Sequence, residues 1–244
     1  MAVEEILFRP SPNFDARGGS PIDMLVLHYT GMKSGAAALD RLTDPAAKVS
    51  SHYLIEEDGR IFKLVEEEYR AWHAGVAFWR GHRDINARSV GIEIVNPGHE
   101  FGYRAFSKAQ MQSVLSLAKD IVACHKIEPR NVVGHSDVAP ARKEDPGELF
   151  DWARLAAEGV GLWIEADVED ADALRLGDEG EGVNRLQRAL GRIGYDAVPT
   201  GQFDEGLAAI VRAFQRHWRQ SRVDGILDAE TQSLIYALDA VIAA

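Results

Sequence analysis

The sequence predicts an α/β or α+β sheet domain followed by a small helical domain. Up to about residue 160, short apolar runs typical of strands alternate with segments of helical spacing. An acidic stretch then covers Glu165–Ala173, and from Leu174 onward the apolar residues follow helical spacing with little strand pattern. These observations divide the 244 residues into a sheet domain at 1–160, an acidic linker at 161–173 and a helical domain at 174–244.

Four segments of the first domain are typical of strands. Met24–Tyr29 is a short apolar run that predicts a buried strand. Ser51–Val65 contains two strand-like runs around Asp58-Gly59, and an Asp-Gly pair in that position is a strong hairpin signal. Ser89–Val95 and Asn131–Asp137 are the remaining two segments.

Two helices are predicted between and after these strands. Ser107 and Gln110 form a capping-box pattern, and the apolar residues that follow them have helical spacing. A shorter helix fits Leu149–Glu158, with Gly159 at its end.

The C-terminal domain predicts three helices. Their apolar residues lie within 183–193, 207–214 and 234–238. The second and third helices begin alike, with Asp204 and Asp228 at N-cap positions where a carboxylate accepts from helix N–H groups. A bundle of about 70 residues is near the minimum for an independent core. Such a domain is expected to bind or anchor rather than to catalyse.

Composition and charge exclude several classes of protein. Lys and Arg number 27 against 38 Asp and Glu, so the net charge is −11, which disfavours nucleic-acid binding and anionic membrane surfaces. The single cysteine, Cys124, excludes an internal disulfide and a cysteine-rich zinc cluster. No apolar run reaches membrane-spanning length. The first residues carry Glu4 and Glu5 in place of the positive charge of a signal peptide, so a cytoplasmic location is expected, with a periplasmic or cell-wall location as the alternative.

The segment Gly134–Gly147 carries the densest chemistry of the sequence. His135 closes a predicted strand, and Lys143 and Asp145 follow at a spacing that projects both to one side of an extended chain. With His28, at the end of the first predicted strand, His135 and Asp145 supply two imidazoles and a carboxylate. That is a catalytic zinc set with the fourth position left for water. The alternatives are a polar loop with a surface lysine, and a His28 hydrogen-bonded in the core.

Glu93 lies in the middle of an apolar strand. The alternation places Val90, Ile92 and Ile94 on one face, and Glu93 on the other. A carboxylate in this position is costly unless it is paired or functional, so Glu93 is either a general base beside the metal or part of an exposed strand face.

Together these stretches resemble the zinc N-acetylmuramoyl-L-alanine amidases of the AmpD/AmiD type, the amidase-2 superfamily. The similar stretches, between Ile22 and Trp152, are LHYT, SSHYLIEEDGRI, AWHAG, SVGIEIVN and GHSDVAPARKEDPG. The resemblance implies a mixed central β-sheet flanked by helices. It also implies hydrolysis of the amide bond between N-acetylmuramic acid, or its anhydro form, and L-alanine of the peptidoglycan stem peptide.

The same resemblance implies roles for individual residues. His28, His135 and Asp145 correspond to the ligands of Zn²⁺, and Glu93 and Lys143 to the catalytic pair. In the related peptidoglycan-recognition proteins, the catalytic members usually carry cysteine at the third ligand position, so Asp145 indicates the bacterial amidase branch. The alternative function is a non-catalytic peptidoglycan-recognition protein, but such members lose a ligand and none is lost here.

The C-terminal block resembles the peptidoglycan-binding domain 1 family. The similar stretches are LRLGDEGEGVNRLQRALGRIGY, TGQFD, VRAFQ and VDGILDAETQ. The sequence departs from the family at Gly206-Leu207, where a threonine commonly starts the helix. The resemblance implies peptidoglycan or a muropeptide as the partner.

Four further residues are candidates for contacts with substrate. Tyr29 and Thr30 follow the predicted ligand His28, His73 lies in the AWHAG stretch, and Arg88 precedes the strand of Glu93. Arg88 would pair with a peptide carboxylate through its forked guanidinium. Packing within the framework, or a surface salt bridge for Arg88, is the alternative interpretation.

Overall fold

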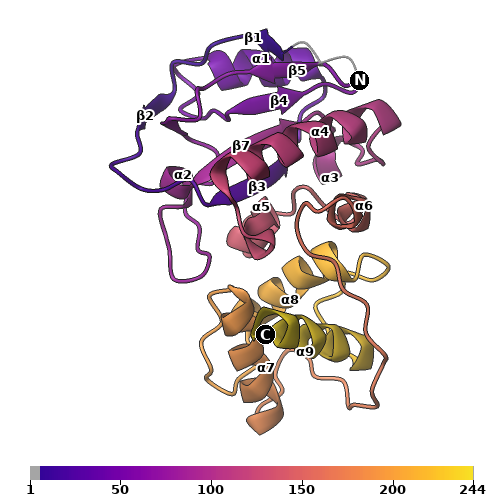
Figure 1. Cartoon of the computed structure of the whole chain (residues 1–244). Helices are drawn as coiled ribbons and strands as arrows, with labels where there is room; N and C mark the ends of the chain where they lie inside the picture. Colours follow the sequence, from indigo (N-terminus) through magenta and orange to yellow (C-terminus); the bar gives the residue numbers. More distant parts are fainter. Residues whose placement is uncertain (1–5, 244) are drawn as a thin grey trace.

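The structure, a computed structural model, describes residues 6–243 (Figure 1). Strands and helices make up the N-terminal part, and three helices make up the C-terminal part. In chain order the elements are β1 (Ile6–Phe8), β2 (Phe14–Ala16), β3 (Met24–Tyr29), α1 (Gly35–Thr43), β4 (Tyr53–Ile55), β5 (Ile61–Lys63), β6 (Tyr69–Ala71), α2 (Ile85–Arg88), β7 (Ser89–Ile94), α3 (Gly98–Phe101), α4 (Lys108–His125), a 3₁₀ turn (Pro129–Asn131), β8 (Val132–Gly134), α5 (His135–Val138), α6 (Trp152–Ala157), α7 (Glu181–Ile193), α8 (Glu205–Trp218) and α9 (Ala229–Ala243).

The central sheet is mixed. Its strand order is β1-β5-β4-β7-β3-β8, and β2 and β6 form a separate antiparallel pair. Strands β4, β7, β3 and β8 run parallel, whereas β4 and β5 form the antiparallel hairpin that Asp58-Gly59 predicts. The α/β fold with a mixed central sheet flanked by helices is therefore confirmed.

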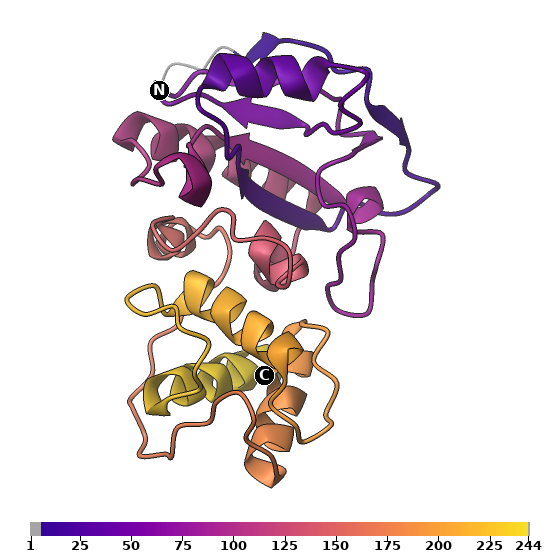
Figure 2. The ribbon, with the colours of Figure 1, turned by 180° about the vertical axis from the view of Figure 1, so that it is seen from behind.

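Helices cover both faces of this sheet. Helix α4 lies in front of the sheet in Figure 1, and α1 lies in front of it in the reversed view of Figure 2. Val90, Ile92 and Ile94 of β7 pack in one apolar cluster with α4. Because side chains alternate along a strand, Glu93 lies on the opposite face, as the alternation predicts.

Two predicted elements differ from those observed. The strand predicted at Asn131–Asp137 ends at Gly134, because the next residues turn into α5 and His135 is its first residue. The helix predicted at Leu149–Glu158 begins only at Trp152, since Asp151 caps it.

The start of α4 also differs in one detail. Ser107 accepts from the Gln110 backbone N–H as predicted, at 3.1 Å. The Gln110 side chain does not return to Ser107; it donates to the carbonyl oxygen of Val95 at 2.8 Å. Burial against the sheet thus gives Gln110 a tertiary partner that a local pattern does not reveal.

The C-terminal helices form where they are predicted. Asp204 accepts from the N–H of Leu207 at 2.8 Å, and Asp228 from the N–H of Thr231 at 3.0 Å. Both predicted N-caps are therefore confirmed. The acidic stretch 165–173 that precedes them is largely exposed.

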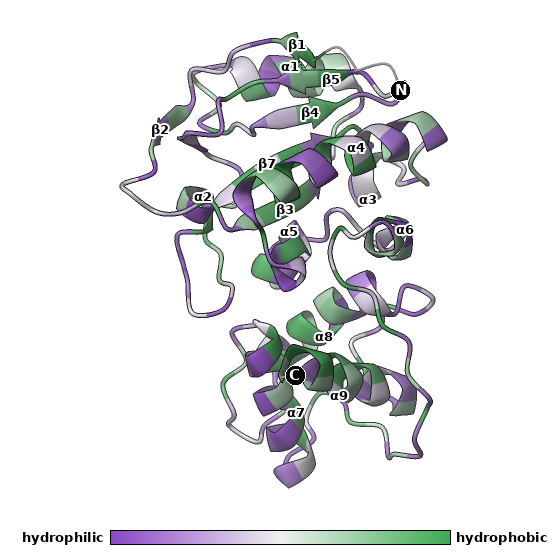
Figure 3. Ribbon diagram, in the orientation of Figure 1, coloured by the Kyte–Doolittle hydropathy of each residue, from purple (hydrophilic) through white to green (hydrophobic). Residues whose placement is uncertain are grey.

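The helical part and the sheet share buried apolar side chains. One cluster joins Val26 of β3, Trp79 and Val138 to Leu190 and Phe214 of the C-terminal helices. Figure 3 shows hydrophobic residues along β3 and along α9, on either side of this junction. The division into separate domains stays a prediction, and any separation would expose this cluster to water.

Within residues 6–243, no helix combines the length and the apolar character needed to cross a bilayer. The predicted cytoplasmic location rests on Glu4 and Glu5, which lie outside the described residues.

Candidate metal centre and active site

A cavity of about 360 Å³ opens at the carboxyl ends of β3 and β7, on the sheet face opposite α4. Parallel strands end at the same edge, and there the pairing places His28 beside Glu93. The long segment that follows β8 closes the other side of the cavity and carries three predicted site residues, His135, Lys143 and Asp145.

The three predicted metal ligands converge beneath this cavity. His28 Nδ1 lies 2.9 Å from His135 Nδ1, and Asp145 Oδ2 lies 3.0 Å from each of these two nitrogens. All three side chains are buried. In a tetrahedral zinc site with bonds of about 2.0–2.1 Å, ligand atoms lie about 3.3 Å apart. The observed triangle is slightly tighter than that and has the right shape.

Hydrogen bonding assigns a proton to the outer nitrogen of each imidazole. His135 Nε2 lies 3.1 Å from the Ala74 carbonyl oxygen, which only accepts, so in the neutral ring Nε2 carries the proton and Nδ1 carries the lone pair. The Ser89 hydroxyl donates to the Ile85 carbonyl and accepts from His73 Nε2. His73 Nδ1 is then an acceptor, and it takes the Nε2–H of His28 at 3.0 Å.

Consequently, three acceptors face one another with no proton between them. Burial, together with the neighbouring His135, lowers the pKa of His28 to about 4, so its imidazole stays neutral at physiological pH. Two lone pairs and a carboxylate at this spacing repel one another unless a cation lies among them. The donor set therefore fits a divalent metal ion, and two imidazoles with one carboxylate are ligands that zinc accepts.

Glu93, the predicted general base, lies beside the three predicted ligands. Its Oε2 is buried and has no hydrogen-bond partner among residues 6–243, and the side chain lines the cavity. Burial, and then the negative charge of Asp145, raises the pKa of Glu93 well above its usual range, while the Lys143 ammonium lowers it. A carboxylate with a raised pKa and a free oxygen is suited to exchanging a proton with a reacting group.

The structure brings three of the four predicted substrate-contact residues to the cavity. Tyr29, Thr30 and His73 all line it. Tyr29 has its hydroxyl 2.9 Å from His99 Nδ1, and the Thr30 hydroxyl donates to the Asn96 carbonyl. His73 Nδ1 contacts His28 and His73 Nε2 contacts the Ser89 hydroxyl, so both nitrogens are engaged and one of them holds a predicted ligand.

Arg88 is not brought to this cavity. Arg88 lies at the amino end of β7, and the site lies at its carboxyl end. The 6 residues of the strand therefore separate Arg88 from the site. Its guanidinium pairs with Asp23 and lines a different cavity. The salt bridge that was the alternative for Arg88 is the arrangement observed.

Sequence reasoning missed the residues that hold this site from behind. Asn86 Oδ1 accepts from the backbone N–H groups of His73 and Ala74, which fixes the loop under His28 and His135. Asp137 accepts from the N–H of Gly134, beside the ligand His135. Asp137 lies two positions after His135 in the GHSD run, and this proximity is the signal that could have drawn attention to it. Its distant partners, Tyr195 and His217, give no such signal in the sequence.

These side chains form a site suited to metal-assisted hydrolysis. Residues 18–148 match the N-acetylmuramoyl-L-alanine amidase family, and residues 179–235 match the putative peptidoglycan binding domain family. The chain belongs to the N-acetylmuramoyl-L-alanine amidases, a family of hydrolases, and the resemblance found in the sequence is confirmed.

Individual relatives agree over most of the chain. It is 40% identical over 230 residues to N-acetylmuramoyl-L-alanine amidase AmiD of Escherichia coli (strain K12), which covers 89% of this chain and 82% of that protein. The solved complex of E. coli AmiD with the substrate anhydro-N-acetylmuramic acid-L-Ala-D-gamma-Glu-L-Lys matches with a TM-score of 0.78 and 38% identity, over 92% of this chain and 91% of that chain. AmpDh3 from Pseudomonas aeruginosa in complex with anhydromuramic pentapeptide matches with a TM-score of 0.75 and 32% identity, over 99% and 98% of the two chains.

Proposed function

We propose that this protein uses zinc to hydrolyse the amide bond between N-acetylmuramic acid, or its anhydro form, and L-alanine of the peptidoglycan stem peptide, in cell-wall recycling or turnover. The observation that carries the proposal is the convergence of three buried side chains, His28, His135 and Asp145, whose ligand atoms lie within 3.0 Å of one another. Glu93 and Lys143 beside them supply a base and a positive charge.

Each residue has a defined task in this reaction. The two imidazoles and the Asp145 carboxylate would hold the ion, which supplies Lewis acidity that makes water a nucleophile near neutral pH. Glu93 accepts the proton of the attacking water through Oε2. Lys143 offers its ammonium group to the negative charge that develops on the carbonyl oxygen. Glu93 then returns the proton to the leaving nitrogen of L-alanine.

The substrate follows from the relatives and from the C-terminal part. The two solved relatives hold anhydromuramyl peptides, so the anhydro sugar with its stem peptide is the first substrate to test. The match of residues 179–235 to a peptidoglycan binding domain supports a second contact with polymeric peptidoglycan. The enzyme would then act on a bound wall fragment as well as on a free muropeptide.

The test combines metal analysis with product analysis. We expect about one zinc per chain, and release of free stem peptide from an anhydro-muropeptide and from intact sacculi. His28→Ala, His135→Ala and Asp145→Ala should each lose zinc and activity together, because a site of three protein ligands cannot spare one. Full zinc occupancy in one of these variants would remove that residue from the ligand set. A zinc-loaded wild-type protein that binds sacculi and releases no peptide would instead be a recognition protein.

A further inference from the structure

The segment between Gly134 and Phe150 carries His135, Lys143 and Asp145, and it lies between the sheet and α8 (Figure 1). We propose that the C-terminal helical part positions this segment, through Tyr195 and His217, and so sets how tightly the metal centre forms. The proposal rests on the metal site of the proposed function. It assigns the helical part a task in the active site besides any contact with the wall.

Asp137 is the point of contact. This carboxylate is 1% exposed, and it lies two residues after the ligand His135. Its Oδ2 accepts from the backbone N–H of Gly134 at 2.7 Å and from His217 Nδ1 at 2.8 Å, and its Oδ1 accepts from the Tyr195 hydroxyl at 2.7 Å. One donor is the residue before His135, and the other two come from the C-terminal part. The carboxylate therefore joins the backbone at a ligand to Tyr195 and His217.

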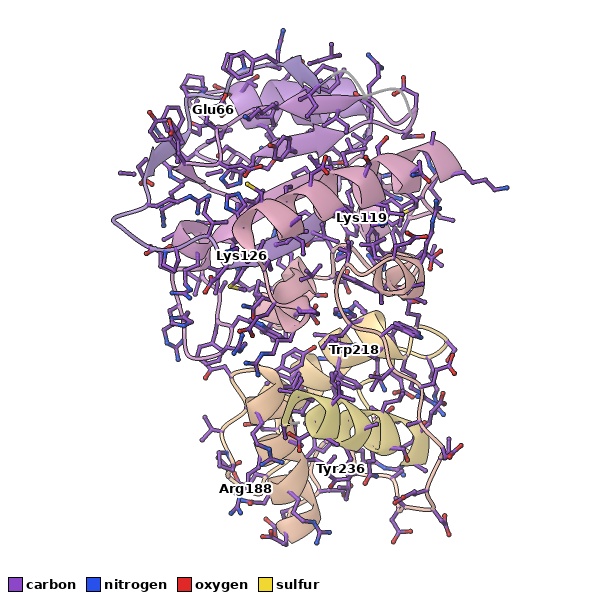
Figure 4. All side chains as sticks on the ribbon, in the orientation of Figure 1. Glu66, Lys119, Lys126, Arg188, Trp218 and Tyr236 are labelled. Carbon is purple, nitrogen blue, oxygen red and sulfur yellow. The ribbon has the colours of Figure 1, made fainter. Side chains whose placement is uncertain are left out.

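His217 is itself fixed in orientation. Its ring stacks between Trp152 of α6, with centroids 3.8 Å apart, and Trp218, with centroids 3.7 Å apart. Figure 4 labels Trp218, which lies where the helical part meets the sheet part. Because both ring faces are covered, the Nδ1–H of His217 is held toward Asp137 before any ligand binds. Tyr195 is likewise buried, with its ring edge against Trp79.

Two further contacts hold the same segment from α8 and the residues after it. Arg216 Nη2 lies 2.7 Å from the Glu144 carboxylate, which stands between Lys143 and Asp145. The Gln220 side chain donates to the Phe150 carbonyl oxygen. The segment is thus held near its start, at its ligand-bearing turn and at its end. Outer partners that orient metal ligands typically change metal affinity by about 10–100-fold when removed.

The experiment measures zinc affinity without substrate, by competition between the full-length protein and a chelator. We expect His217→Ala to weaken zinc binding about 10–100-fold. His217→Asn should recover most of that loss, because its carboxamide N–H stands close to the position of Nδ1. Tyr195→Phe removes one hydroxyl while keeping the ring, so it should weaken zinc binding by a smaller factor and still fold.

Controls separate positioning from general damage. Tyr236 on α9 is 42% exposed and lies away from the junction in Figure 4, so Tyr236→Phe should leave zinc affinity unchanged. Binding of the His217 and Tyr195 variants to sacculi should equal that of the wild type. For a soluble muropeptide, kcat at limiting zinc should fall with the zinc affinity while KM stays within about twofold.

Zinc affinities of His217→Ala and Tyr195→Phe within twofold of the wild type would overturn the proposal, as would failure of His217→Asn to recover affinity when His217→Ala is folded. If His217→Ala does not fold, Tyr195→Phe alone decides. A wild-type protein that binds zinc and has no amidase activity would refute the proposed function and leave this test intact, because its readout is the metal.

Discussion

At the scale of single residues, proton positions define the site more closely than residue types do. Asp145 Oδ2 lies 3.0 Å from an imidazole nitrogen of His28 and of His135, and the same distance occurs in ordinary hydrogen-bonded clusters, where a proton lies between the two atoms. Here the outer nitrogens of His28 and His135 face acceptors, so in the neutral rings these nitrogens carry the protons and the inner nitrogens act as acceptors. His73 contributes by fixing the protonation of His28. This also makes His73 a poor substitute base, since both its nitrogens are already engaged.

Glu93→Gln tests the base directly. The substitution keeps the shape of the side chain and removes its ability to take a proton from water. We expect zinc content to be unchanged and kcat to fall about 10²–10⁴-fold, the range typical of a lost general base. KM should change far less, because the interaction strengthens only in the transition state. A near-normal kcat with full zinc would show that the base is another group.

Lys143 should set the pH at which Glu93 works. Glu93 acts in its ionised form, so activity is lost as the pH falls through the Glu93 pKa, and the Lys143 ammonium lowers that pKa. In Lys143→Ala the pKa of Glu93 rises, and the acid limb of kcat/KM should move to higher pH, with a lower plateau. The plateau should fall about 10²–10³-fold if Lys143 stabilises the oxyanion. Lys143→Arg keeps the charge and should leave the limb in place; an unmoved limb in Lys143→Ala would contradict the coupling.

The sequence singles out His28, Glu93, His135, Lys143 and Asp145 because they lie in short stretches with characteristic neighbours, and the structure brings all five together at one cavity. Arg88 shows the limit of that approach. It lies only five positions from Glu93, but the two residues stand at opposite ends of strand β7. Proximity in the sequence therefore does not mean proximity in space here. The partners of Asp137 lie 58 and 80 residues away along the chain, and no local pattern could connect them.

At the scale of elements, strand β7 supports the candidate metal centre through its smallest residue, Gly91. A Cβ added at Gly91 would lie 2.6 Å from His73 Cγ, closer than packed atoms approach. The missing side chain is what allows His73 to lie beneath His28. Gly91 also donates its N–H to His52 Nδ1, so this one residue of the strand contacts the imidazoles of both His52 and His73.

Gly91→Ala should therefore destabilise the protein and weaken zinc binding together. Overpacking in a rigid core costs typically about 1–3 kcal/mol, and displacement of His73 would disturb the orientation of His28. Gly182→Ala on α7 is the matched control, because its added Cβ meets only Leu174 at 3.5 Å. That variant should be neutral or stabilised by up to about 1 kcal/mol. Thermal unfolding with and without zinc measures both; a Gly91→Ala protein as stable and as tightly zinc-binding as Gly182→Ala would refute the role of this close contact.

Elements with strong local signals were predicted well, and those defined by tertiary partners were not. The apolar run of β3 and the Asp-Gly hairpin form where the sequence places them. Strands β1, β2 and β6 have 3 residues each, too few for a pattern of alternation. Sheet order also escapes prediction, because parallel pairing of β3 with β7 and β8 depends on long connections.

At the scale of the whole molecule, the sequence predicts two parts and the structure shows how they meet. The helical periodicity after Leu174 gives three helices, but it does not reveal which of their faces lies against the sheet domain. That face covers Trp79, whose ring meets Tyr195 at 5.1 Å, and Gly194 approaches the same indole so closely that an added Cβ would lie 2.7 Å away. The acidic stretch between the parts is exposed, as a linker is expected to be.

Truncation after Ala171 tests whether the two parts are independent. The apolar clusters around α4 and α1 lie wholly within residues 22–163, so the sheet should still fold. The shared cluster around Val26, Trp79 and Val138 would lose its cover, and Asp137 would lose two of its three donors. We therefore expect a folded amidase part that melts several degrees lower, binds zinc less tightly, and binds sacculi less well while still cleaving small muropeptides when zinc is in excess. Far-UV circular dichroism, thermal unfolding and chelator competition measure these outcomes. A truncated protein with the melting temperature and zinc affinity of the full chain would mean that the junction contributes nothing to the site, and one that fails to fold would mean that the two parts are a single domain.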